Sequence, residues 1–312
     1  MHISARLPAT VAACCGSALR LVLPAFAALA SACGGGSSDG GGSTPPTAAG
    51  PGVAAISESG GLPAGYTLVW SDEFDVDGMA DTSKWGYDTS RNSIGWFNHE
   101  LQYYSAARPE NSRITGGSLV IEARHEDLSL AQYPDWGGQH YTSARLVTRD
   151  LASWTYGFVE VRARLPCGVG TWPAIWMVSA LPQVVWPAGG EIDIMEHVGF
   201  DPGVIHGTVH TTDYNGKLGN QRTATTLMAD VCSNFHRYQL TWTPTRITIG
   251  MDDHNYFQYS NDGSGMSEWP FDNPQFLILN IAIGGDWGGQ HGVDDSIFPV
   301  DMEIDYVRVY QR

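Results

Sequence analysis

The sequence predicts an all-β domain in which two antiparallel sheets pack face to face as a sandwich, or close into a barrel. Short segments alternate between apolar and polar positions and are rich in β-branched and aromatic residues, whereas no long segment has a helical period. The chain also contains 37 glycines, 17 prolines and 11 tryptophans, which is typical of a turn-rich β-protein. The clearest strand candidates are residues 118–124, 156–165, 238–243, 246–252 and 302–310.

The charge of the chain restricts its partners. Its formal net charge is -16. Nucleic-acid binding depends on clustered Lys and Arg, so this charge argues against nucleic acid as the partner. A neutral polymer is compatible with the charge, and the abundant tryptophans suit one.

The N-terminus, residues 1–32, predicts an export signal. Arg6 and Arg20 are positive, the apolar run LVLPAFAALA is too short to span a bilayer, and Ala30-Ser31-Ala32 supplies small residues before Cys33. The same site resembles a bacterial lipoprotein box, which would make Cys33 the lipidated first residue of an outer-membrane lipoprotein. The alternative is ordinary cleavage at the same place, which would release a secreted protein.

Composition divides the rest of the chain into a linker and one domain. Residues 33–61 are mostly Gly, Ser, Thr, Pro and Ala, so they cannot bury a core and are expected to act as a flexible tether. From residue 62 to residue 312 the composition stays uniform, without a second linker or an internal repeat. We therefore expect one catalytic domain over 62–312.

The cysteines predict a disulfide. Cys14 and Cys15 would leave with the signal and Cys33 would be acylated, so that Cys167 and Cys232 remain. In an exported protein an even remainder favours a bridge. The alternative is two buried free thiols.

The stretch GGEIDIMEHVG, residues 189–199, contains three carboxylates with unequal spacing. In a strand, Ile192 and Ile194 would face the core while Glu191 and Asp193 face outward. Glu196 can join that outer face only if one residue is extra, so the spacing predicts a β-bulge at Ile194-Met195. Glycosidic cleavage needs two carboxyls in different protonation states, which three acids on one face can provide. The alternatives are a solvated polar face or a calcium cluster.

Aromatic and histidine residues lie near this stretch in the sequence. In GTWPAIWM a strand would place Trp172 and Trp176 on one face, as a platform for sugar rings, although tryptophans also fill cores. His197, His206 and His210 raise the alternative of a zinc site, but their spacing fits no common zinc pattern, and His197 should lie on the core side.

Several blocks, taken in order, resemble glycoside hydrolase family 16, specifically its bacterial laminarinase-like members. The blocks are LVWSDEF, NHELQYYS, SWTYGFVEVRARLP, TWPAIWM, GEIDIMEHVG, IHGTVH and IDYVRVYQ. The resemblance extends from about Tyr66 to Arg312 and implies a concanavalin A-like β-jelly roll with an open substrate cleft. It also implies hydrolysis of internal β-glycosidic bonds with retention of anomeric configuration.

The resemblance also implies residue roles. Glu191 matches the nucleophile, Asp193 the assisting acid and Glu196 the acid/base. The substrate-binding candidates are Trp172, Trp176, His210, Asn98, Glu100 and Arg145. The loop GGDWGG adds Trp287 as a candidate at the edge of the cleft, and the alternative is a structural tryptophan. A structural Ca²⁺ ion would be held at Glu73, Gly117 and Asp305, and no cofactor would serve catalysis. The block FNHELQYY departs from the usual asparagine-rich form at His99.

The function expected from these observations is that of a monomeric endo-β-1,3-glucanase acting on laminarin-like β-glucan. Another polymer, such as mixed-linkage glucan, agarose, carrageenan or galactan, is the alternative, because loops select the substrate. A glucan-recognition protein without chemistry is a further alternative. Such relatives typically lose the catalytic acids, which are present here.

Lipidation can be tested by mass. If Cys33 is the lipidated first residue, detergent-extracted protein should show the mass of a chain that begins at Cys33 and carries acyl groups. A Cys33→Ser variant should lack that mass and leave the membrane fraction. An unmodified Cys33 in the wild-type protein would contradict the prediction.

Overall fold

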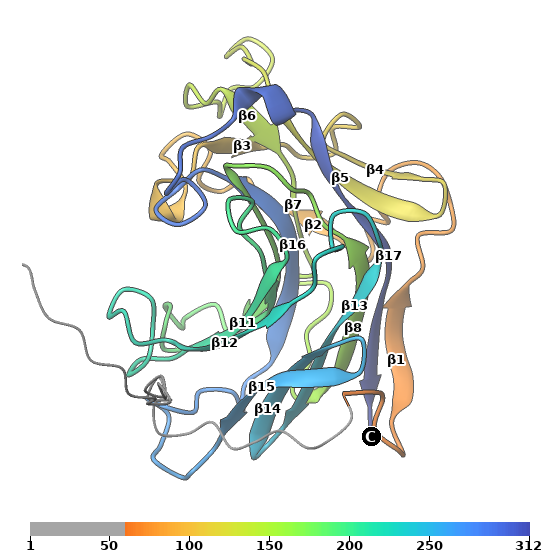
Figure 1. The fold of residues 1–312 in the computed structure, drawn as a ribbon, viewed down its shortest axis with the longest axis vertical. Coiled ribbons are helices and arrows are strands. Elements are labelled where there is room, and N and C mark those ends of the chain that lie inside the picture. The colour runs from red at the N-terminus through yellow and green to blue at the C-terminus, as the bar shows by residue number, and fades with distance from the viewer. Residues whose placement is uncertain (1–59) are drawn as a thin grey trace, which may run out of the picture. The chain divides into compact units, whose positions relative to one another are not determined.

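The computed structural model describes residues 60–312, and its architecture is a sandwich of two sheets (Figure 1). The predicted signal segment, Cys33 and nearly all of the predicted linker lie outside the described residues. Two short 3-10 helices, η1 (Phe97–His99) and η2 (Asp295–Ile297), are the helical elements of the described part. Within that part, no helix is long and apolar enough to cross a membrane. The predicted sandwich is confirmed, and the alternative of a closed barrel is wrong.

One sheet has ten strands and forms one layer of the sandwich. Its order is β15-β14-β13-β8-β17-β5-β6-β3, with β1 paired to β17 and β4 paired to β5. The bounds are β1 (Thr67–Asp72), β3 (Gln102–Tyr104), β4 (Ser112–Thr115), β5 (Ser118–His125), β6 (Tyr141–Ser143), β8 (Gly157–Arg164), β13 (His236–Thr243), β14 (Arg246–Met251), β15 (His254–Ser260) and β17 (Val300–Gln311).

The other sheet has seven strands in the order β12-β11-β10-β9-β16-β7-β2. The bounds are β2 (Gly86–Tyr87), β7 (Arg145–Val147), β9 (Thr171–Ser179), β10 (Glu191–Glu196), β11 (Val204–His210), β12 (Arg222–Leu227) and β16 (Gln275–Ile283). The strands from β9 to β12 are consecutive in sequence and adjacent in space. The carboxylate strand β10 therefore lies inside the sheet, between β9 and β11.

The five predicted strand segments are strands β5, β8, β13, β14 and β17. Asp252 and Asp253 join β14 to β15 with φ values of 48° and 66°, as expected for the tight turns that suit the twist of a hairpin. One pairing differs from the expected antiparallel pattern, because β3 and β6 are parallel. A parallel pair needs a crossover connection, and residues 105–140, which include the β4–β5 hairpin, provide it.

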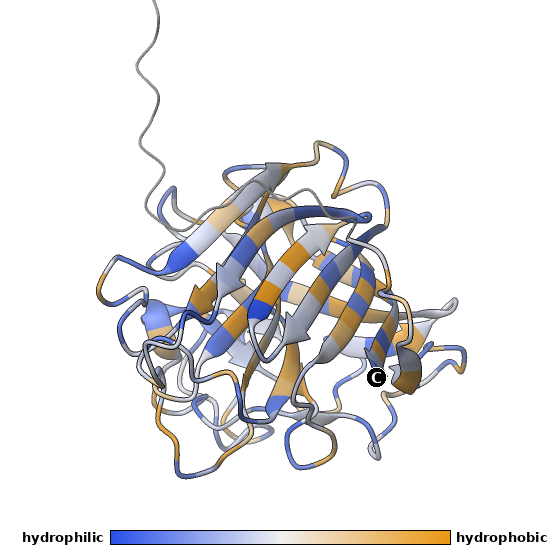
Figure 2. Ribbon diagram, turned by 90° about the horizontal axis from the view of Figure 1, so that it is seen from below, coloured by the Kyte–Doolittle hydropathy of each residue, from blue (hydrophilic) through white to orange (hydrophobic). Residues whose placement is uncertain are grey.

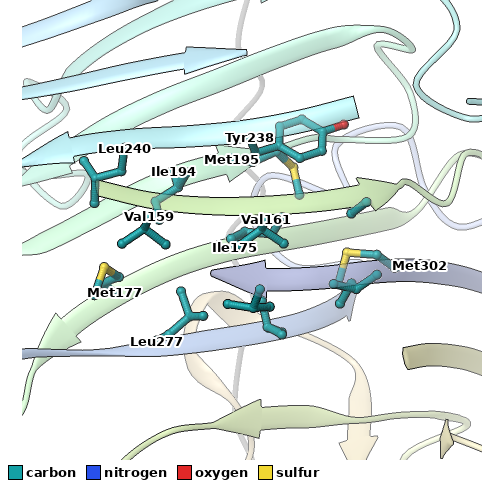
Figure 3. Packing of buried hydrophobic residues seen from close by; sticks show 14 of the residues in the cluster. Val159, Val161, Ile175, Met177, Ile194, Met195, Tyr238, Leu240, Leu277 and Met302 are labelled. Carbon is teal, nitrogen blue, oxygen red and sulfur yellow. The ribbon is translucent and has the colours of Figure 1, made fainter. Parts of the chain in front are cut away.

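The core lies between the sheets and takes residues from both (Figure 3). Val161 on β8 and Leu240 on β13 face Ile175 and Met177 on β9, and all four are fully buried. Figure 2 shows the corresponding alternation of hydrophobic and hydrophilic positions along the strands. Because successive side chains of a strand point to opposite faces, part of every strand of the seven-stranded sheet projects from its outer face.

The predicted disulfide is present between Cys167 and Cys232, whose Cα atoms lie 5.8 Å apart. The alternative of two free thiols is wrong. The bridge closes a loop with a sequence separation of 65 residues, which contains strands β9 to β12. It therefore encloses the strand that carries the three carboxylates.

The bridge should contribute measurably to stability. In the chain-entropy model a loop of this length stabilises the folded state by ~4 kcal/mol. A Cys167→Ser/Cys232→Ser double variant should lose a comparable free energy of unfolding in denaturant titrations. Reduction should destabilise the wild type and leave the double variant unchanged. Equal stability of the oxidised wild type and the double variant would contradict the prediction.

Candidate active site

Strand β10 is irregular where the carboxylate spacing predicts it. On the β9 side, Asp193 pairs with Trp176 and Met195 pairs with Ile175, so Ile194 is the extra residue. On the β11 side, the register also shifts between Asp193 and Glu196. The predicted bulge at Ile194-Met195 is confirmed.

The bulge separates the apolar residues of β10 from its acids. Ile192, Ile194 and Met195 are fully buried in the core. Glu191 and Glu196 are half-buried on the outer face, and Asp193 between them is 2% exposed. Glu196 therefore does not point into the core, as it would in an unbroken strand. The alternative of a solvated face of acids is wrong.

His210 on β11 contacts two of the three acids, close to the position that the resemblance implies. Its Nε2 lies 3.2 Å from Asp193 Oδ2 and 3.9 Å from Glu191 Oε1. Its Nδ1 accepts a hydrogen bond of 3.1 Å from the backbone N–H of Gly216. In the neutral ring the proton is therefore on Nε2, the nitrogen nearest the acids.

Burial changes the ionisation of all three acids. It raises the pKa of Glu191 to about 8, and a charge on Asp193 would add to this effect. It also raises the pKa of Glu196 to about 7, although a charge on His210 would lower it. The pKa of Asp193 is raised well above its usual range, first by burial and then by the charge of Glu196. The group therefore does not carry three charges near neutral pH, because desolvation disfavours them.

Trp172 contacts Glu196, and Trp287 packs against Trp172. The Trp172 Nε1–H donates a hydrogen bond of 3.1 Å to Glu196 Oε1. The Trp172 ring meets the Trp287 ring edge to face, with ring centroids 5.3 Å apart. The centroid of the His206 ring lies 4.8 Å from that of Trp287. The sequence suggested His206 only as a zinc ligand. On β11, His206 pairs with Glu196 because of the bulge in β10. The predicted bulge is therefore the sequence signal that could have placed His206 at the site.

Trp176 is held from two sides. Its Nε1–H donates to Asn280 Oδ1 at 2.7 Å, and the Arg145 guanidinium lies 4.7 Å from the centre of its ring. Arg145 is 8% exposed and its Nε lies 3.3 Å from Asp88 Oδ2. Arg145 therefore supports the Trp176 ring from the protein side. No sequence signal indicated Asn280, because β16 lies far along the chain from β9.

Asn98 and Glu100 lie beside the loop that carries Trp287. The Asn98 side chain donates a hydrogen bond to Glu100 Oε1 at 3.2 Å, and the Asn98 carbonyl accepts one of 2.7 Å from the Asp286 N–H. Glu100 also forms a β-bridge with Gly284. Burial raises the pKa of Glu100. These predicted residues thus fix the GGDWGG loop next to Trp172.

The alternative zinc site is not formed. His197 is fully buried, as expected, and its Nε2 accepts a hydrogen bond from the Gly203 N–H at 3.2 Å. Within residues 60–312, His197, His206 and His210 share no cluster of ligand atoms.

The positions expected to hold calcium lie on the other sheet. The Glu73 carboxylate pairs with Arg308 at 2.7 Å, and Asp305 pairs with Arg162 at 2.6 Å. Gly117 lies in the turn between β4 and β5. Each carboxylate is already neutralised by an arginine, an arrangement that does not favour a divalent cation at these side chains.

This chain is similar to known proteins over most of its length. A family model described as glycosyl hydrolases family 16 matches residues 99–308. A β-glucanase of Rhodothermus marinus is 52% identical over 254 residues, which cover 79% of this chain and 85% of that protein.

Solved structures show the same fold. A mutant of SCLam, a non-specific endo-β-1,3(4)-glucanase with a 1,3-β-D-cellobiosyl-glucose at its active site, superposes with a TM-score of 0.80 at 54% identity, covering 82% of this chain and 98% of that one. The laminarinase from Rhodothermus marinus superposes with a TM-score of 0.74 at 51% identity, covering 79% and 97%. The predicted jelly roll is thereby confirmed. Because the family model matches most of the chain and a relative is 52% identical over most of both proteins, the chain belongs to glycosyl hydrolases family 16.

Proposed function

We propose that the protein is a retaining endo-β-1,3-glucanase that cleaves laminarin-like β-glucans by double displacement. The observation that carries the proposal is the set of three acids, one buried and two half-buried, on one face of the bulged strand β10. The names of the relatives support the substrate class, since they include a β-glucanase, a laminarinase and an endo-β-1,3(4)-glucanase.

The resting site needs one charged nucleophile and one protonated acid. Asp193 is 2% exposed, whereas the Glu191 side chain is 16% exposed. The contact with Asp193 raises the pKa of Glu191, but desolvation is most severe at Asp193, and we propose that this effect prevails, so that Asp193 is protonated and Glu191 carries the charge. Glu196 holds a second proton, because burial raises its pKa to about 7.

Cleavage then proceeds in two steps. The Glu191 carboxylate attacks the anomeric carbon while Glu196 donates its proton to the leaving glycosidic oxygen. Glu196, now a base, takes a proton from water, whose oxygen attacks the same carbon and releases Glu191. Two inversions give net retention. Members of this family need no cofactor for this chemistry.

The aromatic side chains give the site a surface for sugar rings. Trp172, Trp176 and Trp287 are each half-buried, so each presents part of an indole outside the core. The C–H faces of a sugar can pack on such rings. Trp172 would also link binding to chemistry, since its N–H contacts the carboxyl of Glu196.

Mixed-linkage glucan is the second candidate substrate, because the SCLam relative is described as acting on β-1,3(4)-glucans. Sulfated polymers have less support. The nearby Arg145 is engaged by Asp88 and by the Trp176 ring. A binding protein without chemistry has less support as well, because all three acids are present in the arrangement that catalysis needs.

We also retain three proposals that rest on the sequence. The protein is exported, it is anchored to the outer membrane through Cys33, and its catalytic domain works as a monomer. A structural calcium ion at Glu73, Gly117 and Asp305 has the support of the family resemblance alone, and the arginine pairs of Glu73 and Asp305 argue against it. No step proposed above uses one.

The nucleophile can be identified by chemical rescue. Glu191→Ala should lose turnover, and azide should restore cleavage of an activated aryl β-laminaribioside by giving the α-glycosyl azide, because the small anion replaces the missing carboxylate. Glu196→Ala is the matched control. It should give the β-glycosyl azide, and Glu196→Gln should lower kcat on laminarin by about 10²–10⁴-fold.

Different outcomes test the roles of the two acids and the identity of the substrate. An α-azide from Glu196→Ala would reverse the assignment of the two acids. Turnover of galactans in place of β-glucans, on a panel of purified polymers, would reject the proposed substrate and leave the mechanism standing.

The alkaline limb of the pH profile should report Glu196. The general acid must be protonated, so kcat/KM should fall as pH rises through about 7. The Trp172 N–H lowers this pKa, so Trp172→Phe should move the limb to higher pH while keeping an aromatic ring. With a dinitrophenyl β-laminaribioside, which needs no acid, Glu196→Ala should show no such limb. A limb that moves to lower pH in Trp172→Phe would contradict this assignment.

A further inference from the structure

The loop of residues 211–220, between β11 and β12, is organised around one buried amide. Asn215 is 4% exposed. Its Nδ2 donates hydrogen bonds to the carbonyls of Thr211 and Thr212 at 3.0 and 3.2 Å. Its Oδ1 accepts from the backbone N–H groups of Lys217 and Leu218 at 3.1 and 3.2 Å. All the donor and acceptor groups of this side chain are thus used to shape the loop.

A second asparagine closes the same loop. The Asn220 Oδ1 accepts a hydrogen bond of 3.0 Å from the Asn215 N–H, and the Asn220 Nδ2 donates one of 3.0 Å to the Asp213 carbonyl. The Asp213 N–H in turn donates to the Ser267 carbonyl at 3.1 Å, which ties the loop to a neighbouring segment. The conformation of the loop is therefore specified by side chains, although most of its residues are exposed.

This conformation directs one backbone donor at the catalytic site. The Gly216 N–H donates to His210 Nδ1 at 3.1 Å. A ring nitrogen that accepts a hydrogen bond carries no proton, so the neutral ring has its proton on Nε2. A second proton, on Nδ1, would face the Gly216 N–H and would replace an attractive contact with a repulsive one.

The surroundings of His210 show why this contact is needed. From β10, Asp193 and Glu191 lie 3.2 and 3.9 Å from Nε2, distances at which an imidazolium would form ion pairs. From the segment before β10, Trp186 lies against the ring with centroids 5.9 Å apart. The Lys217 ammonium lies 5.0 Å from the centre of the Trp186 ring. The acids thus face Nε2, whereas a backbone donor faces Nδ1.

The charge on His210 affects the groups that perform the chemistry. A positive His210 would lower the pKa of Glu191 and also that of Glu196, the third acid on β10. Glu196 would then lose the proton that it must donate. The protonation state of His210 is thus coupled to the function of the general acid.

We propose that Asn215 is a positioning residue that acts through the Gly216 N–H to keep His210 neutral, with its proton on Nε2, and thereby keeps Glu196 protonated for catalysis. The first half of this statement concerns the ring alone. The second half rests on the proposed function, since it assigns Glu196 as the general acid.

Two variants and one matched control test the proposal. Gly216→Pro removes the N–H that faces Nδ1. Gly216→Ala keeps this N–H. The added Cβ would lie 3.5 Å from His210 Cε1, which is an ordinary contact, and Gly216 does not have the left-handed backbone conformation that would strain an alanine. Asn215→Ala removes the side chain that shapes the loop, and serves if Gly216→Pro does not fold.

The first readout is the long-range ¹H–¹⁵N NMR spectrum of the histidine rings, with His210 assigned by its loss in His210→Gln. In the wild type and in Gly216→Ala, His210 should have an unprotonated Nδ1 and a protonated Nε2 near neutral pH. In Gly216→Pro and Asn215→Ala, a larger fraction of His210 should carry both protons at the same pH. A doubly protonated His210 in the wild type, or spectra unchanged in both variants, would overturn the proposal.

The second readout is the pH profile of kcat/KM on β-glucan. A positive His210 would lower the pKa of Glu196, so the profiles of Gly216→Pro and Asn215→Ala should move to lower pH, while Gly216→Ala stays with the wild type. Altered spectra with an unmoved profile would reject the coupling to Glu196. A wild type with the expected spectra and no glucanase activity would instead reject the proposed function and leave the role of the loop intact.

Discussion

One extra residue in strand β10 is the constraint on which the site depends. In a regular strand, residues that are five positions apart point to opposite faces, so Glu191 and Glu196 could not act on one sugar. Because Ile194 is extra, Ile192, Ile194 and Met195 remain in the core while the acids reach the outer face. The sandwich makes this irregularity tolerable, since β9 and β11 hold β10 on both sides.

Burial of the acids on that face limits how many of them can ionise. Carboxyls held out of water cannot all ionise, and the surrounding groups decide which of them carries the charge. Trp172 contacts Glu196, while His210 contacts Asp193 and Glu191. Outside the two sheets, Gly216 in the loop after β11 donates to His210, and Trp186 before β10 lies against the His210 ring. The sheet thus positions the acids, and the loops contact the histidine beside them.

The sequence contained the signals for the strands, the disulfide and the bulge, because these follow from alternation, from counting cysteines and from one anomalous spacing. Through the family resemblance it also placed His210 near the acids and Trp172 in the substrate cleft. It did not indicate Asn280, Trp186 or Asn215, whose roles arise from contacts between segments far apart in the chain or from the shape of a loop. The parallel pairing of β3 with β6 was missed for a similar reason, since it depends on a long crossover. Local pattern therefore specified the elements and the acids, whereas the groups that adjust the acids required the fold.

The stereochemistry of hydrolysis tests the central claim most directly. Retention requires Glu191 to bond to the sugar, and it requires the carboxyls of Glu191 and Glu196 to lie about 5–5.5 Å apart. The configuration of the first reducing end released from laminarin can be followed by ¹H NMR immediately after a large amount of enzyme is added, before mutarotation. The account predicts that the β-anomer appears first and that the α-anomer accumulates later. If the α-anomer appears first, water attacks the sugar directly, and the double displacement built on the bulged strand is wrong.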